Sequence, residues 1–325
     1  MCGIFGIISN NSQNDDYIES LTKKISFFLS NRGPDNSGFW KDKESNIFIG
    51  HTRLSIIDIS ERSNQPIESL NRRFVMSYNG EIYNFRDLIK ELKETNVNIS
   101  NYNSDTSVLL SCFESWGIEK TLTKINGMFS IALWDKKERK LFLIRDRVGI
   151  KPLYYAYINK LFIFASELKS FTVLKSYLTL NNKAVSEYFN YGYISSKQTI
   201  YNECFRLLPS SVLELKLNNI NDYKIYKYWD LQKLSKTQRY ASSNIELINQ
   251  TAFKIEESVK NQMISDVPIG SFLSGGIDSS LVTTFMQKNS TKKINTFSIG
   301  SNNYDYDESN NAKKISEYLG TNHNE

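Results

Sequence analysis

Residues 2–9 of this chain are CGIFGIIS, an apolar run of strand length that begins at a cysteine. Such a short run followed by polar residues predicts a buried strand over 3–9. Apolar residues then recur at helical spacing over 16–30, which predicts a helix. Many strands interrupted by a few helices predict a layered α+β domain. Further strands are predicted at 47–50, 54–59, 74–78, 128–134, 141–145, 153–157 and 161–165, and further helices near 84–94 and 105–116.

The pattern changes in the last third of the chain. From about 200 to 240 it loosens, and Tyr, Asn, Lys and Ser become frequent, which favours a connection between domains. A strand–helix–strand order after this region predicts the start of a parallel α/β sheet. Its elements are an amphipathic helix over 244–264, a strand over 269–273, a helix over 278–288 and a strand over 294–299.

Length and composition agree with a two-domain globular protein. The chain has 325 residues, and domains average roughly 150 residues. It is 40% hydrophobic and 23% charged, within the ordinary range for globular domains. We therefore expect a first domain over 2–200, a connector over 201–240, and a nucleotide-binding domain over 241–325 of which the chain contains only the N-terminal part.

Charge and cysteine usage exclude several classes of protein. The net charge is +5 with dispersed basic residues, so we expect no nucleic acid partner and no membrane partner. The first residues have no basic leader, and no stretch approaches the ~18 apolar residues of a membrane helix. Three widely spaced cysteines form neither a disulfide framework nor a zinc motif, which favours a reducing, cytoplasmic setting.

Cys2 is the first candidate for chemistry. Removal of Met1 would make Cys2 the terminal residue, with an α-amine of unperturbed pKa about 8. That amine could act as general base for the thiol. The chain has only His51 and His323 as histidines, which leaves few candidates for a Cys–His pair. The alternative is that Cys2 is a small buried side chain at the start of a strand.

Four short motifs follow Cys2: RGPD at 32–35, GHTRLSI at 50–56, YNGEIYN at 78–84 and SDT at 104–106. Together with the cysteine, and in this order, they resemble the class II glutamine amidotransferases. The resemblance spans residues 2 to about 190. It implies an N-terminal-nucleophile glutaminase domain, whose fold is a four-layer αββα sandwich of the α+β class.

The roles implied by this resemblance suit the chemistry of glutamine. A planar arginine fork suits the α-carboxylate, and two carboxylates suit the α-ammonium. Cys2 is then the nucleophile, and Asn79 with the Gly80 N–H forms an oxyanion hole. The expected glutamine-binding residues are Arg53, Leu54, Ser55, Ile56, Ile57, Asn79, Gly80, Glu81 and Asp105.

Each of these residues also has a structural interpretation. Arg53 could form a surface salt bridge, and Asp105 could be the N-cap of a helix over 106–116. Asn79-Gly80 is typical of a type I′ hairpin turn. The segment 32–35 is expected to be a mobile loop that closes the pocket, or simply a turn. For His51 we expect a structural role.

Residues 269–280, IGSFLSGGIDSS, form a second constellation. Glycines let backbone N–H groups approach phosphate, and a helix N-terminus favours anions. No Gly-Lys-Ser/Thr follows, so this is not a Walker loop. The stretch looks like the SGGxDSS signature of ATP pyrophosphatases, and helix capping is the alternative for its aspartate. The resemblance implies that Ser274, Gly275, Gly276, Asp278, Ser279 and Ser280 bind pyrophosphate, that Leu273 and Ile299 lie near the adenine, and that Asp278 is also a ligand of Mg²⁺.

The two halves together resemble the glutamine-hydrolysing asparagine synthetases. Tyr228-Trp229 is also typical of them, whereas 208–211 (LPSS) replaces their usual Pro-Gly and is expected to be a surface change. The resemblance implies glutamine, aspartate and ATP as substrates, a β-aspartyl-AMP intermediate, and asparagine, glutamate, AMP and pyrophosphate as products.

Three other functions stay open. The chain could amidate another carboxylate, on a surface sugar or a peptide. It could also have glutaminase activity alone, or be a non-catalytic remnant that binds glutamine or a partner. The sequence leaves the oligomeric state undecided, with a homodimer as one option.

Overall fold

The computed structural model describes residues 1–9, 15–42, 44–94, 97–195, 197–237, 243–301 and 307–325. The chain divides into two compact units, Met1–Leu234 and Ser235–Glu325.

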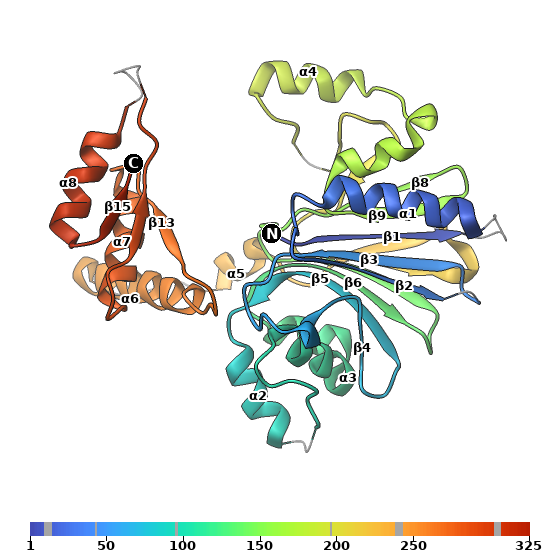
Figure 1. Cartoon of the computed structure of the whole chain (residues 1–325), viewed down its shortest axis with the longest axis horizontal. Helices are drawn as coiled ribbons and strands as arrows, with labels where there is room; N and C mark the ends of the chain where they lie inside the picture. Colours follow the sequence, from blue (N-terminus) through green and yellow to red (C-terminus); the bar gives the residue numbers. More distant parts are fainter. Residues whose placement is uncertain (10–14, 43, 95–96, 196, 238–242, 302–306) are drawn as a thin grey trace. The chain divides into compact units, whose positions relative to one another are not determined.

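Two antiparallel six-stranded sheets form the centre of the first unit (Figure 1). The first sheet has the order β10-β8-β9-β1-β3-β2, and the second has the order β12-β11-β7-β6-β5-β4. The strands of the first sheet are β1 (Gly3–Ser9), β2 (Asn36–Asp42), β3 (Ile47–Arg53), β8 (Tyr154–Ile158), β9 (Leu161–Ala165) and β10 (Cys204–Arg206). Those of the second are β4 (Ile67–Glu68), β5 (Phe74–Ile82), β6 (Gly127–Asp135), β7 (Lys140–Arg145), β11 (Ser211–Lys216) and β12 (Tyr223–Lys227).

Helices cover the outer face of each sheet (Figure 1). The first sheet packs against α1 (Asp15–Leu29) and the 3₁₀ segment η2 (Leu168–Tyr177). The second sheet packs against α3 (Asp105–Lys124), and α2 (Phe85–Glu94) packs against α3. The layers are therefore helix, sheet, sheet and helix, which confirms the predicted αββα sandwich. The remaining helical segments of this unit are η1 (Glu61–Ser63), α4 (Asn182–Tyr191), η3 (Leu217–Asn219) and α5 (Leu231–Thr237).

Strand β1 shows why its sequence is almost continuously apolar. Ile4 and Ile8 belong to the core between the two sheets, whereas Phe5 and Ile7 belong to the core beneath α1. Successive side chains of a strand point to opposite faces, so a strand buried on both faces needs apolar residues at every position. Strand β9 alternates in the same way between the two cores.

The predicted strand at 54–59 is wrong, because these residues form a loop. Arg53 Nη1 donates to the carbonyl oxygen of Ser60 at 2.8 Å, and Nη2 donates to that of Asp58. Asp58 itself adopts a left-handed backbone with φ +49°. The chain therefore curls back over the end of β3, and the apolar residues that suggested a strand lie in this loop.

Two further strand regions differ from the sequence prediction. Strand β2 was not predicted, because its sequence NSGFWKD is an edge strand with mostly accessible side chains and lacks an apolar run. The range 201–240, expected as a connector, contains β10, β11 and β12, which extend both sheets. Strand β12 lies at the edge of its sheet and contains Lys224 and Lys227. Lysines on an edge strand oppose pairing with another chain. They also interrupt the apolar pattern from which a strand is predicted.

The segment 208–211 was expected to be a surface change, and this is wrong for Ser210. Its side chain is buried, its N–H donates to Asp146 O at 2.8 Å, and its carbonyl accepts from Tyr228 N at 3.0 Å. It has φ +55°, the left-handed region that favours glycine. Serine is therefore held at a position where glycine would be unstrained.

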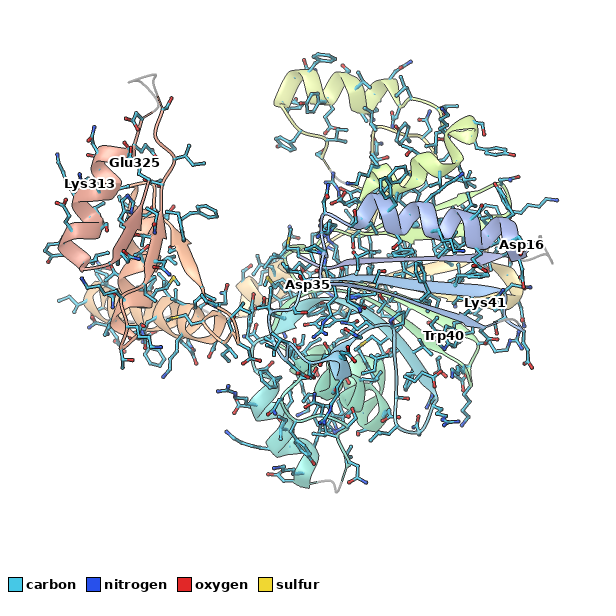
Figure 2. All side chains as sticks on the ribbon, viewed as in Figure 1. Asp16, Asp35, Trp40, Lys41, Lys313 and Glu325 are labelled. Carbon is cyan, nitrogen blue, oxygen red and sulfur yellow. The ribbon has the colours of Figure 1, made fainter. Side chains whose placement is uncertain are left out.

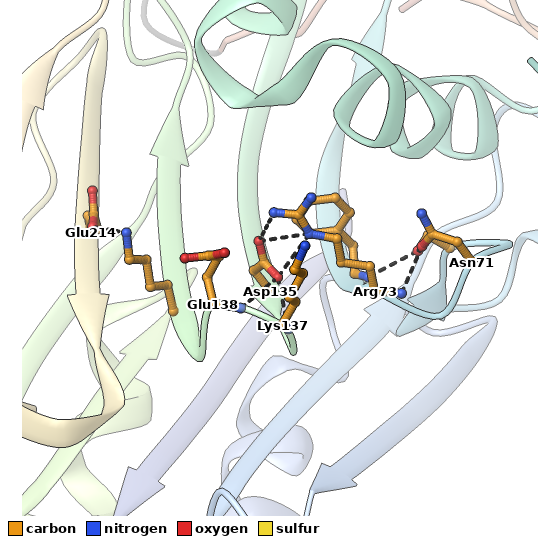
Figure 3. Close-up of polar contacts among 9 residues, drawn as sticks. Asn71, Arg73, Asp135, Lys137, Glu138 and Glu214 are labelled. Carbon is orange, nitrogen blue, oxygen red and sulfur yellow. Dashed lines mark hydrogen bonds and ion pairs between the residues drawn. The ribbon is translucent and has the colours of Figure 1, made fainter.

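Ion pairs fix one end of the second sheet (Figure 3). Arg73 binds both carboxylate oxygens of Asp135, with Nε 3.1 Å from each of them and Nη2 2.7 Å from Oδ2. The same carboxylate accepts from the backbone N–H groups of Lys137 and Glu138 in the turn between β6 and β7. These contacts lie at the start of β5 and therefore hold the register at the opposite end from Asn79 to Ile82.

The second unit contains a three-stranded parallel sheet of order β13-β14-β15. A strand–helix–strand unit begins it, as predicted, and Val259, Phe285, Met286 and Ile294 form its small core. Ile248, on the predicted apolar stripe of α6, is 66% exposed. The elements are α6 (Asn244–Gln262), β13 (Gly270–Phe272), α7 (Ile277–Lys288), β14 (Asn295–Phe297), α8 (Ser309–Leu319) and β15 (Asn322–Asn324).

Within the ranges described above, none of the helices combines the length and the apolar character needed to cross a bilayer.

Candidate active site

One end of the sandwich brings together the start of β1, the end of β3 and the end of β5. Gly3 pairs with Thr52, so Cys2 lies beside the residues that follow β3. In Figure 2, Asp35 marks this end of the first unit, while Trp40 and Lys41 lie at the other end of β2. The pocket here is lined by Met1, Cys2, Arg53, Leu54, Ile56, Ile57, Ser63, Gln65, Tyr78, Asn79, Gly80, Glu81, Asp105, Thr106 and Lys151.

All the predicted glutaminase residues except Ser55 line this pocket. The Ser55 N–H instead donates to Asp35 Oδ2 at 2.7 Å, and Asp35 N donates to Arg53 O at 3.0 Å. The segment 32–35, predicted to be a closing loop, is therefore joined to the loop after β3.

Cys2 is held against the chain at Leu54. Its Sγ lies 3.4 Å from Leu54 N, which donates to it, and 3.6 Å from Leu54 O. Arg32 Nε donates to the Cys2 carbonyl at 2.9 Å, and its Nη1 pairs with Glu167 at 3.1 Å. Burial raises the pKa of the Cys2 thiol, although the contact with Leu54 opposes this. The sulfur is thus fixed in position at the pocket and is mostly protonated at neutral pH.

Asn79 and Gly80 lie inside β5, so the hairpin-turn interpretation is wrong. They pair with Ser130 and Phe129 of β6. The Asn79 side chain is 1% exposed, and among the described residues its Nδ2 has no hydrogen-bond partner. Leaving such a donor unsatisfied costs about 1–3 kcal/mol. An oxyanion formed in the pocket would satisfy this donor.

Gly80 is required by the close approach of β6. A Cβ atom at this position would lie 2.2 Å from the carbonyl oxygen of Met128 and 2.8 Å from the Phe129 Cα. Both are backbone atoms of the paired strand, so they cannot move aside without breaking the β5–β6 ladder. The glycine therefore keeps its backbone exposed to the pocket with no side chain over it.

Asp105 is the first residue of α3, and the interpretation of it as N-cap is wrong. The N-cap is Ser104, whose Oγ accepts from Ser107 N at 3.4 Å. The Asp105 carboxylate instead accepts from Ile82 N at 3.0 Å and from Tyr78 Oη at 2.9 Å. Burial raises the pKa of Asp105, although these donors oppose the rise. Its role is to place a carboxylate against the end of β5.

Arg53 is buried, so the interpretation as a surface salt bridge is wrong. Its Nη1 donates to Ser60 O and to Asn64 Oδ1, each at 2.8 Å, and its Nη2 donates to Asp58 O. A guanidinium has five N–H donors. Within the described part of the chain, two of them are left for a ligand.

Several residues that line the pocket were not predicted from the sequence. Tyr78 is fixed at both backbone groups, since its N–H donates to Gln65 Oε1 at 2.7 Å and its carbonyl contacts His51 Nε2 at 3.1 Å. A carbonyl only accepts, so the proton of His51 sits on Nε2. Burial lowers the pKa of His51 to about 3, so it is neutral and structural, as expected. The other lining residues that were not predicted are Met1, Ser63, Gln65, Thr106 and Lys151.

The residues around Lys151 could have identified it as a candidate for a functional position. It stands between a glycine turn and Pro152, and the apolar strand β8 follows. A charged residue between a turn and a buried strand is a candidate for a functional position, because it gains nothing from the core.

The loop at 274–280, where pyrophosphate binding is predicted, is held together by hydrogen bonds to its own serine hydroxyls. Ser274 Oγ and Ser279 Oγ lie 2.9 Å apart, and Gly276 N donates to Ser274 Oγ at 3.3 Å. Gly275 has φ +84°, and a Cβ there would lie 2.8 Å from Asn311 Cβ. Glycine is therefore needed both for its conformation and for the close approach of α8.

Helix α7 begins at this loop with its N-terminus uncapped. The N-cap is Gly276, which makes no side-chain cap, so the capping interpretation of Asp278 is wrong. Asp278 lies exposed in the first turn. Nearby, Leu273 is buried and its N–H donates to Phe297 O at 2.8 Å, whereas Ile299 is 86% exposed.

The chemistry of this loop is compatible with Mg²⁺. Among the described residues no group of three or more His, Cys, Asp or Glu side chains could hold a metal ion. Mg²⁺ commonly needs only one or two carboxylates, with substrate phosphates and water as its other ligands. The single exposed Asp278 beside the phosphate loop fits that kind of site.

Residues 1–229 match the family described as glutamine amidotransferase domain. The chain belongs to this family. Residues 251–325 match the family described as asparagine synthase. The amidotransferase match ends close to the boundary between the two units at Leu234, so each unit corresponds to one family.

Two curated proteins illustrate the relationship of this chain to known proteins. The putative asparagine synthetase (glutamine-hydrolyzing) 2 of Methanocaldococcus jannaschii is 34% identical, over 99% of this chain and 64% of that protein. The asparagine synthetase (glutamine-hydrolyzing) 1 of Bacillus subtilis is 32% identical, over 98% of this chain and 49% of that protein. The chain thus spans about half to two thirds of the length of these relatives.

A solved structure shows the same fold. The glutamine phosphoribosylpyrophosphate amidotransferase of B. subtilis, in complex with ADP and GMP, aligns with a TM-score of 0.51 at 16% identity. The alignment covers 99% of this chain and 65% of that one. At this identity the similarity is one of fold, and it agrees with the αββα sandwich of this chain.

Proposed function

We propose that this chain hydrolyses glutamine at Cys2 and transfers the released ammonia to ATP-activated aspartate, giving asparagine, glutamate, AMP and pyrophosphate. The observation that carries the proposal is the unsatisfied amide of Asn79, which is buried in the wall of the pocket that also contains the Cys2 sulfur. A donor held without a partner beside a nucleophile is what acyl transfer requires. The names of the curated relatives support aspartate as the acceptor.

The reaction would begin at the thiol. Once Met1 is removed, the Cys2 α-amine takes the thiol proton, and the sulfur attacks the carboxamide carbon of glutamine. The negative charge moves to the amide oxygen, which accepts from Asn79 Nδ2 and the Gly80 N–H. Collapse of this intermediate breaks the C–N bond, and the leaving nitrogen takes the proton from the α-ammonium. Ammonia leaves, and a thioester remains on Cys2.

Hydrolysis of the thioester completes the glutaminase half. Water attacks the thioester carbonyl while the neutral α-amine takes a proton from it. The same two donors hold the second oxyanion, and its collapse restores the thiol and releases glutamate. One amine therefore serves as base and acid in turn, which agrees with a pocket whose nearby histidine, His51, is neutral and bonded to the backbone.

The remaining pocket residues suit the amino-acid end of glutamine. Arg53, with two donors left, would bind the α-carboxylate, and Asp105 with Glu81 would bind the α-ammonium. Asp105 already accepts from Tyr78 and Ile82, so it is positioned before a ligand arrives. The backbone of 54–57 would complete the site around the ligand.

The second unit would activate the acceptor. Pyrophosphate would be bound by 274–280, and Asp278 would be a ligand of Mg²⁺, which would offset the phosphate charge. The adenine would lie near Leu273 and Ile299. Attack of the acceptor carboxylate on the α-phosphorus would release pyrophosphate and form an acyl-adenylate, whose AMP is then displaced by ammonia. A cytoplasmic location and a homodimer remain predictions of the sequence.

The test is glutamate release by the purified chain, with Cys2→Ala and the buried-thiol control Cys112→Ala beside it. Mass spectrometry of the N-terminus reports whether Met1 is removed. We expect release from wild type and Cys112→Ala and none from Cys2→Ala. The proposed glutaminase activity would be refuted if the wild-type chain were folded and had a free Cys2 amine but released no glutamate.

The acceptor is tested by adding ATP, Mg²⁺ and aspartate to the same samples. Asparagine and AMP formed in equal amounts would support the synthetase half. Glutamate release without asparagine would restrict the function of this chain to glutamine hydrolysis.

A further inference from the structure

The turn at 145–151 is built around a buried carboxylate. Asp146 Oδ2 accepts from the backbone N–H of Lys151 at 2.9 Å and from that of Phe129 at 3.2 Å. Its Oδ1 accepts from the N–H groups of Val148 at 3.2 Å and Ile150 at 2.9 Å. Four backbone donors on one carboxylate hold the turn in a single shape and attach it to β6.

Arg145 fixes the same turn from the other side. Its Nε donates to Lys151 O at 2.8 Å, and its Nη2 donates to Gly149 O at 2.7 Å. Both backbone groups of Lys151 are therefore bound. Because Phe129 pairs with Gly80 across β6 and β5, the turn is placed relative to the strand that contributes the oxyanion donors.

The Lys151 side chain lines the glutamine pocket together with Cys2 and Glu81. The residue is 6% exposed. Within the described part of the chain its ammonium makes no hydrogen bond or ion pair, and it keeps some access to the pocket that it lines. The titratable and charged groups that act on it are Glu81 of β5, Cys2, Arg32, Asp146 and the terminal amine. Burial raises the pKa of Glu81, and the charge of Lys151 opposes this rise.

A buried cation without a fixed partner is unfavourable for folding. Burial lowers the pKa of Lys151, and the charge of Glu81 opposes this. Proteins keep such an unfavourable group mainly at functional sites. The turn at 145–151 therefore holds the positive charge of Lys151 at the pocket in which the Cys2 sulfur and the amide oxygen of glutamine become negative during the reaction.

We propose that Lys151 is a positioning residue of the glutaminase reaction, which acts through Cys2 by favouring the thiolate and by keeping the neighbouring α-amine neutral. The inference rests on the proposed glutamine hydrolysis. A positive charge near a thiol favours its ionised form, and near an amine it disfavours the protonated form. Both effects lower the pH at which the amine–thiol pair becomes active.

The experiment compares the full chain with Lys151→Met, which removes the charge at similar volume, and Lys151→Arg, which keeps it. Alkylation of Cys2 by iodoacetamide is followed against pH by peptide mass spectrometry, with Cys2→Ala as the background. Lys151→Met should shift the alkylation midpoint upward by about one pH unit. Lys151→Arg should restore most of the wild-type profile. An unshifted midpoint in Lys151→Met would overturn the proposal.

Steady-state kinetics and stability separate this role from a structural one. Lys151→Met should lower kcat for glutamine about tenfold at pH 7 with a smaller change in KM, since one pH unit of midpoint corresponds to a tenfold change in the ionised fraction. Its melting temperature should stay the same or rise, because a buried unpaired charge is removed. A Lys151→Met chain that melts well below wild type or fails to fold would count against the proposal.

Failure of this proposal is distinguishable from failure of the proposed function. Alkylation and melting do not require glutamine turnover, so they decide the role of Lys151 even if the wild-type chain releases no glutamate.

Discussion

Asn79 holds a buried amide that no other described residue satisfies. Replacement by alanine should therefore remove transition-state stabilisation without disturbing packing. We expect Asn79→Ala to lower kcat by about 10²–10³-fold, the usual cost of one oxyanion donor, with little change in KM. Steady-state glutaminase kinetics at constant pH measure both parameters.

Asn84 is the matched control, because it lies in the same sequence motif but has structural partners. Its Nδ2 donates to Lys124 O at 3.0 Å, and its Oδ1 accepts from Asn126 N at 2.8 Å. Asn84→Ala should lower stability and leave kcat almost unchanged. A similar loss of kcat in both variants would show that Asn79 acts through the fold.

His51 makes stability depend on pH. Its pKa falls from 6.5 in the unfolded chain to about 3 when buried, so between these values the unfolded state binds a proton that the folded state does not. The contribution is constant above pH 6.5 and stability is lost as the pH falls through 6.5 toward 3. From pH 7 to pH 5 the loss from this group is about 2 kcal/mol.

The variant His51→Gln isolates this effect, because glutamine can still donate to Tyr78 O but has no proton to gain. Asp105 and Glu81, whose pKa values are raised by burial, act in the opposite direction and are common to both proteins. Urea unfolding followed by tryptophan fluorescence at pH 7 and pH 5 should show a smaller loss in the variant. Equal losses would refute the assignment to His51.

At the scale of elements, β5 and the turn at 145–151 carry the site. Strand β5 places Asn79, Gly80 and Glu81 on the pocket, and its partner β6 connects it to Asp146. Ser210 N donates to Asp146 O, so the backbone of the segment before β11 supports the same turn. Residues from three separate parts of the chain therefore act as one framework.

Ser210 is the strained position in that framework, with φ +55°. Glycine has no Cβ to oppose this conformation, and the strain of another residue is roughly 1–2 kcal/mol. We expect Ser210→Gly to raise the melting temperature by about 2–4 °C, the effect of about 1 kcal/mol on a domain of 150–250 residues. Differential scanning calorimetry gives the comparison.

Ser211 supplies the control, because it lies in β11 and pairs with Lys227. Glycine in a strand interior costs stability, so Ser211→Gly should lower the melting temperature. If Ser210→Gly also melted lower than wild type, the strain assigned to Ser210 would be wrong.

For the molecule as a whole, every residue that lines the pocket at Cys2 lies in the first unit. This unit has two cores of its own, between the sheets and beneath α1. It also holds all four tryptophans, at positions 40, 116, 134 and 229, so tryptophan fluorescence reports on it alone.

We therefore expect a chain ended after residue 234 to fold and to retain glutaminase activity with kcat and KM close to those of the full chain. Circular dichroism, tryptophan fluorescence and glutamate release test this. A folded but inactive 1–234 chain would show that the pocket depends on residues of the second unit.

Elements with strong local patterns were predictable from the sequence. Strands β1, β6, β7 and β9 are buried runs, and α1, α6 and α7 have apolar residues at helical spacing, so their periodicity identifies them. Strand β2 was not predicted because it is an edge strand with a mostly polar sequence. The loop at 54–59 was wrongly predicted as a strand because its residues are mostly apolar. The pairing of distant segments decides such cases.

The candidate reactive groups could be predicted from the residues alone: a thiol at position 2, the amide and glycine of Asn79-Gly80, an arginine and carboxylates that suit an amino acid, and the Ser-Gly-Gly loop. These depend on residue type and local spacing, which are encoded along the chain. The folded chain was needed to show that Asn79 lies in a strand with its amide unsatisfied, that Ser104 rather than Asp105 caps α3, and that Lys151 lines the pocket. Those facts depend on which distant backbone groups satisfy each buried polar atom, and that is settled when the two sheets pack together.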